Sequence, residues 1–155
     1  MLGGPFGLVL PPLIYAGQAG ASTKVAAIER EATLLSRIGS NHLGGNIGSS
    51  TFRRTLTAIL RRPLGLTVET KKRLSVESNQ AVSAWMRAHL SLAVAPCGDR
   101  ATLAHVEEAV LERLDPPLNL QGMAPTPIRR RLKELRKELS IPSVGETEPP
   151  RTVTD

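Results

Sequence analysis

The spacing of apolar and polar positions predicts five helices in this chain. Apolar side chains recur at every third or fourth position over residues 22–43 and again over residues 100–114, as they do along the buried face of a helix. Three further segments each follow a residue that can cap a helix. The predicted helices are residues 22–43, 51–62, 79–90, 100–114 and 127–139.

Short polar side chains mark the expected helix starts, because their oxygens can accept from free backbone N–H groups. The expected N-caps are Ser49, Ser50 or Thr51 for the second helix, Ser78 for the third, Asp99 for the fourth and Thr126 for the fifth. The third helix is expected to turn Ala81, Ala84, Trp85 and Leu90 inward. The fourth is expected to bury a stripe formed by Leu103, Val106, Val110, Leu111 and Leu114.

Shorter apolar runs predict a small sheet. Phe6–Leu10 and Leu13–Ala16 can form an antiparallel pair, and residues 65–69 alternate as a half-buried strand does. Residues 90–96 are apolar almost throughout, which is typical of a central strand. We therefore predict an α/β (α+β) fold with a small, central, mostly antiparallel sheet flanked by helices. Residues 1–123 would form one domain, 124–140 a basic helix packed on it, and 141–155 a disordered tail.

Charge and composition narrow the possible partners. Lys and Arg number 20 against 14 Asp and Glu, a net charge of +6 that favours a polyanion such as nucleic acid. Aromatic residues are only 3% of the chain, which argues against a protein that binds by stacking on unpaired bases. The single Cys97 excludes an internal disulfide and a cysteine-rich zinc site, and fits the cytoplasm. The apolar residues 1–17 are interrupted by Gly and Pro, so we expect neither a signal peptide nor a membrane helix.

Two places in the sequence offer candidate chemistry. Tyr15 ends an apolar run and is followed by Gly-x-x-Gly at residues 17–20, so its hydroxyl is expected at the mouth of a loop. The start of the second helix combines free N–H groups with Ser50, Arg53 and Arg54, which together could seat a phosphate.

Arg30 and Arg37 lie seven residues apart, so they would share a helix face and could point at one anion. The basic residues of helix 127–139 favour contact with a nucleic-acid backbone and a plain solvated face about equally. They are Arg129, Arg130, Arg131, Lys133, Arg136 and Lys137.

The order of four motifs resembles the GIY-YIG nuclease superfamily, and most closely its small bacterial members. The motifs are Ile-Tyr-Ala-Gly at residues 14–17, Arg-x-x-x-x-His at 37–42, Gly-Ser-Ser-Thr-Phe-Arg-Arg at 48–54, and Glu107 followed twelve positions later by Asn119 within Leu-Asp-Pro-Pro-Leu-Asn-Leu at 114–120. The resemblance covers about residues 7–122. It implies an endonuclease that hydrolyses DNA phosphodiester bonds with Mg²⁺ or another divalent cation, and with no small-molecule cofactor.

The resemblance also implies a role for each matching residue. Tyr15 would position or deprotonate the attacking water, and Arg37 would steady the phosphate, with Arg30 as the alternative. Glu107 would hold the metal ion, Asn119 would order the loop that closes the site, and His42 would contact phosphate or assist proton transfer.

The first motif of the family departs from its pattern here. The only candidate for Gly-Ile-Tyr is Gly7-Leu8-Val9, and Tyr15 is the single tyrosine. Gln18 also stands where the family often has lysine. Either a first strand lies upstream of Met1 or catalysis has been lost. The alternatives are thus a non-catalytic nucleic-acid-binding module and a basic protein-interaction domain. The oligomeric state is left open.

Overall fold

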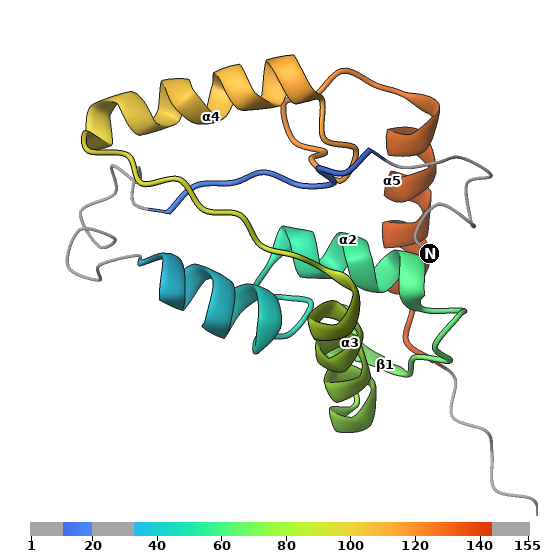
Figure 1. Ribbon diagram of the computed structural model, residues 1–155. Helices are drawn as coiled ribbons and strands as arrows, with labels where there is room; N and C mark the ends of the chain where they lie inside the picture. The colour runs from blue at the N-terminus through green and yellow to red at the C-terminus, as the bar shows by residue number, and fades with distance from the viewer. Residues whose placement is uncertain (1–10, 20–32, 144–155) are drawn as a thin grey trace, which may run out of the picture.

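Helices are the main regular elements of the computed structural model, which describes residues 11–19 and 33–143 (Figure 1). In chain order the elements are η2 (Ser36–Leu43), α2 (Thr51–Leu60), β1 (Val68–Thr70), β2 (Arg73–Leu74), α3 (Val76–His89), α4 (Arg100–Leu114) and α5 (Pro127–Leu139). None of the helices among the described residues has the length and apolar content needed to span a bilayer.

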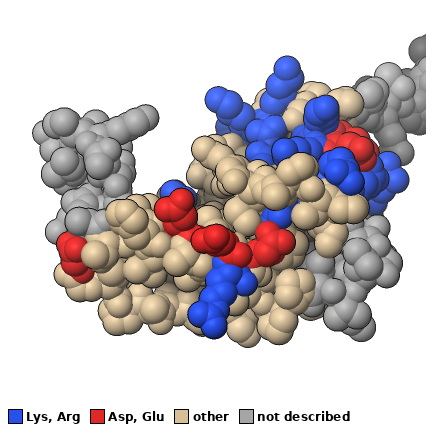
Figure 2. All heavy atoms as spheres, turned by 90° about the horizontal axis from the view of Figure 1, so that it is seen from above, with Lys and Arg blue, Asp and Glu red and all other residues tan. Residues whose placement is uncertain are grey.

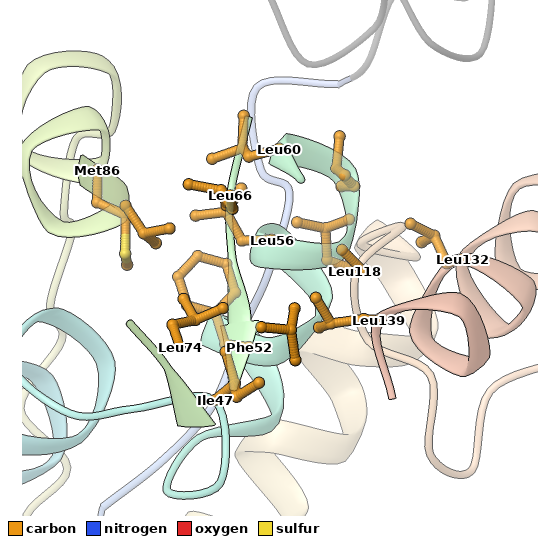
Figure 3. Close-up of a cluster of buried hydrophobic side chains, with 14 residues drawn as sticks. Ile47, Phe52, Leu56, Leu60, Leu66, Leu74, Met86, Leu118, Leu132 and Leu139 are labelled. Atoms are coloured by element: carbon orange, nitrogen blue, oxygen red, sulfur yellow. The ribbon is translucent and has the colours of Figure 1, made fainter. Parts of the chain in front are cut away.

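Helix α2 supplies much of the core. Every residue from Thr55 to Leu60 on this helix is buried, because neighbouring elements cover it on more than one side. Figure 3 shows Leu132 and Leu139 of α5 against one side of α2, and Met86 of α3 near the other. Burying each such side chain contributes about 1.5–3 kcal/mol, so these contacts fix how α5 and α3 sit on α2.

The sheet is an antiparallel pair of strands in which Val68 lies opposite Leu74. Both side chains are buried in the core, while Lys71 and Lys72 form the exposed turn between the strands. The α+β class with a small antiparallel sheet is therefore confirmed. The division of the chain at residue 123 stays a prediction.

The predicted strand at residues 90–96 is wrong. This segment is an irregular connection between α3 and α4, and Leu92 and Val94 are 66% and 59% exposed. An apolar run becomes a central strand only where strands pair with its backbone on both sides, and the described sheet lies elsewhere in the fold.

Three of the predicted helix starts are confirmed by their caps. The side-chain oxygens of Ser50, Asp99 and Thr126 accept from backbone N–H groups three residues ahead. The third start is wrong, because Ser75 rather than Ser78 is the N-cap of α3. The Ser78 hydroxyl instead accepts from the backbone N–H of Thr67, at 2.8 Å.

The buried faces of two helices also differ from expectation. Helix α3 buries Val82, Ser83 and Met86, whereas Ala81 and Ala84 are exposed. Helix α4 has the predicted bounds but lies beside the core rather than in it (Figure 1). Along its expected buried stripe, Leu103, Val110 and Leu111 are half-buried and Val106 and Leu114 are exposed.

The segment from Leu13 to Ala16 forms no strand but runs alongside the loop that follows α4. The backbone N–H of Leu118 donates to the carbonyl of Ile14 at 2.9 Å. Its expected partner, Phe6–Leu10, and residues 22–32 of the first predicted helix lie outside the described residues. The described part of that helix ends at Leu43, as predicted.

Candidate active site

Tyr15 and His42, two residues that the sequence singled out, meet on the ring of Phe52. The Tyr15 ring centroid lies 4.6 Å from that of Phe52 and 6.0 Å from that of His42, the latter in an edge-on arrangement. His42 Nδ1 is 2.6 Å from the hydroxyl oxygen of Ser50, which also caps α2 by accepting from the Arg53 N–H. The cluster therefore joins the N-terminal segment, η2 and the start of α2.

Burial, and to a smaller extent the nearby positive charge of Arg37, lowers the pKa of His42 from 6.5 to about 4. The ring is therefore neutral at pH 7. Helix η2 is a π-helix, in which i→i+5 hydrogen bonds widen the turn, as the bond from Gly44 N–H to the Gly39 carbonyl does at 2.7 Å. This winding brings residues five apart, such as Arg37 and His42, closer to one face.

Asn119 clamps the residue that follows Tyr15. Its side-chain oxygen accepts from the Ala16 N–H at 3.0 Å, and its side-chain nitrogen donates to the Ala16 carbonyl at 2.8 Å. The amide group thus makes the two hydrogen bonds that a neighbouring strand would make. Asn119 thereby fixes the backbone from which the Tyr15 side chain projects.

Arg129 of α5 holds the Asn119 loop in turn, and its role was missed from the sequence. Its side chain is almost fully buried, donates to the carbonyl oxygens of Asn119, Ala124 and Pro116, and forms an ion pair with Asp115 at 2.7 Å. A signal was present, since Arg129 lies three residues before the buried Leu132 and hence on the same helix face.

Glu107 lies apart from this cluster, on α4. It is half-buried and lines an open hollow of about 690 Å³ whose lining contains no Lys or Arg. Other oxygen-bearing side chains on its wall are Glu108, Glu112, Asp115 and Gln121. In residues 11–19 and 33–143, no three or more His, Cys, Asp or Glu side chains form a group that could hold a metal ion by themselves.

The residues expected to contact substrate fall into different places. Arg53 is 0% exposed, and its guanidinium donates to protein oxygens. It therefore has a structural role here and does not offer the contact with phosphate that the sequence predicted. Arg54 is half-buried and donates to the Ser140 hydroxyl at 2.7 Å. Ser50 is buried beneath His42. Arg30 lies outside the described residues.

Comparison with known proteins agrees with the order of these motifs. The family described as the GIY-YIG catalytic domain matches residues 11–138, more than half of the chain. The matched span includes Tyr15, His42, Glu107 and Asn119. No curated protein and no solved structure matches the chain significantly. The chain belongs to the family of GIY-YIG catalytic domains.

Proposed function

We propose that this protein is a divalent-metal-dependent endonuclease that hydrolyses DNA phosphodiester bonds. Membership of the GIY-YIG family suggests a nuclease-type function. The observation that carries the proposal is the meeting of Tyr15, His42 and Ser50 beside the segment that Asn119 clamps. A tyrosine hydroxyl and an imidazole at one place can bind and orient a water molecule, while the buried Ser50 holds the imidazole.

The proton chemistry follows from the state of His42. The neutral imidazole has a free lone pair that can accept a hydrogen bond from water, but its lowered pKa makes it a weak base at pH 7. Its Nδ1 contact with Ser50 fixes the direction of the ring. The Tyr15 hydroxyl would position the attacking water, as the family resemblance implies. Arg37, which is exposed and acts electrostatically on His42, would bind the phosphate that is cut.

Glu107 would hold the metal ion. Carboxylate oxygens are the ligands that Mg²⁺ prefers, and the hollow around Glu107 has several of them and no lysine or arginine on its wall. One or two carboxylates with water and substrate oxygens make an ordinary magnesium site. Such an ion, when bound, would stabilise the negative charge that develops on the phosphate.

Cleavage of a supercoiled plasmid with Mg²⁺ or with EDTA tests this function. We expect the wild-type protein to cut only with Mg²⁺, and Tyr15→Phe and Glu107→Gln to abolish cutting. Glu77→Gln is the matched control, because it removes the same charge from the exposed surface of α3. Cutting that survives in both Tyr15→Phe and Glu107→Gln would refute the site.

A non-catalytic nucleic-acid-binding module is the second candidate. The observation that favours it is the absence of a second tyrosine, because Tyr15 is the only one in the chain. DNA binding without cutting under any divalent metal would establish this alternative. In either case we propose that the protein works in the cytoplasm, where its exposed Cys97 would stay reduced.

A further inference from the structure

A basic pocket of about 410 Å³ lies between α2 and α5, outside the cluster around Tyr15. Arg54 of α2 forms one wall, and cationic side chains of α5 form another. The lining residues are Arg54, Leu120, Gln121, Lys133, Arg136, Lys137 and Ser140, so the wall has four positive charges and no carboxylate. Figure 2 shows many Lys and Arg side chains gathered on one part of the surface, with fewer Asp and Glu among them.

These four cations differ from their neighbours in lacking acidic partners. Arg62 and Arg131 both pair with Glu138, and Arg129 pairs with Asp115. None of the cations lining the pocket forms an ion pair within the described part of the chain. The Arg54 side chain contacts the Ser140 hydroxyl through Nη2, but its Nε is buried and has no hydrogen-bond partner among the described residues.

The arrangement is unfavourable while the pocket holds no anion. Lys133, Arg136 and Lys137 recur at three- and four-residue spacing, so like charges face each other along one side of α5. Burial, and then the charge of Arg54, lowers the pKa of Arg136. A buried donor without an acceptor adds a further cost. A bound anion would relieve the repulsion between these positive charges.

We propose that this pocket binds a phosphate group of the nucleic-acid backbone, outside the cluster around Tyr15. Arg54 follows Phe52 by two residues, which on a helix is a rotation of about 200°, so it faces away from Tyr15. Gln121 lines both this pocket and the hollow around Glu107, so the two are neighbours. One strand could therefore reach both. The proposal rests on the proposed function only in taking nucleic acid as the ligand.

The test is binding of a fluorescently labelled DNA duplex in EDTA, measured by anisotropy over a range of salt concentrations. We expect the double variant Lys133→Gln, Lys137→Gln to bind more weakly. The slope of log K against log salt should become shallower by about 1, the value for one lost phosphate contact. The control Lys71→Gln, Lys72→Gln removes the same charge from the exposed β1–β2 turn and should keep the wild-type slope.

Equal slopes in the two double variants would overturn the proposal, because net charge alone would then explain any loss. Measuring in EDTA separates this result from cleavage: a protein that binds DNA through the pocket but never cuts refutes the nuclease and not the pocket. Thermal melting with inorganic phosphate distinguishes the source of the anion. A rise in Tm that Lys133→Gln, Lys137→Gln abolishes, with an unchanged DNA slope, would assign the pocket to free phosphate and overturn the backbone contact.

Discussion

Replacing Arg53 with methionine tests whether a buried cation ties α2 to η2 and α3. Its Nη1 donates to the carbonyls of His42 and Leu43 at 2.9 and 3.0 Å. Its Nη2 donates to the backbone and side-chain oxygens of Asn79, both at 2.7 Å, and to the Ser83 hydroxyl at 2.9 Å. Methionine keeps most of the side-chain volume and none of these donors.

The expected cost follows from the acceptors left behind. Burial and the charge of Arg87 lower the pKa of Arg53 to about 10, so the side chain is still charged at pH 7. Removing one partner from a buried, charged hydrogen-bond network costs about 3–5 kcal/mol. Domains of this kind have about 5–15 kcal/mol of unfolding free energy in total. At roughly 2–4 °C per kcal/mol, we expect Tm to fall by about 6–20 °C.

Urea denaturation and thermal melting would measure the loss, with Arg54→Met as the control. Arg54 is the next residue on the same helix and has a single side-chain hydrogen bond, so its replacement should cost only about 1 kcal/mol. Arg53→Lys should fall between the two, because lysine keeps the charge and loses the fork of donors. If Arg53→Met and Arg54→Met destabilise the protein equally, the buried network does not hold these elements together.

Three further predictions concern residues around the site. Stability should fall by up to about 3 kcal/mol between pH 7 and pH 4, because the unfolded state protonates His42 near 6.5 and the folded state only near 4; urea titrations should show a flatter pH profile for His42→Gln. Asn119→Ala should cost about 1–3 kcal/mol and speed hydrogen exchange at the Ala16 amide, which loses its acceptor. Gly45→Ala should cost about 1–3 kcal/mol by thermal melting, since its Cβ would lie 2.5 Å from a backbone carbonyl oxygen, whereas Gly98→Ala has open space and should be neutral.

Local chemistry in the sequence predicted the helix start at Thr126 and limited the start of α2 to Ser49, Ser50 or Thr51, because a cap depends only on the next three residues. It predicted Ser78 as the N-cap of the third helix, but Ser75, three residues earlier, can also cap a helix and does so. The choice is made by the Thr67 N–H, which takes the Ser78 hydroxyl as its acceptor. That contact comes from another element, so no local pattern contains it.

Among the candidate site residues, the sequence identified some correctly by their motifs but could not predict which side chains are buried. Motif order identified Tyr15, His42 and Asn119, and the structure brings the first two together and the third to the adjacent Ala16. The sequence could not separate Arg53 from Arg54, since neighbours on a helix differ by only about 100° of rotation. That rotation turns one guanidinium into the core and the other toward the basic pocket.

The two buried arginines, Arg53 and Arg129, show that not all of the positive charge of the chain is available to bind a polyanion. Arg53 donates to backbone carbonyls in the last turn of η2, and Arg129 donates to backbone carbonyls of the loop that contains Asn119. Buried carbonyl groups need donors, and a two-stranded sheet supplies few of them. A guanidinium has five N–H donors and can serve several carbonyls at once. Part of the +6 charge therefore stabilises the loops around the candidate site, and the phosphate contacts that we propose would come from cations at the surface.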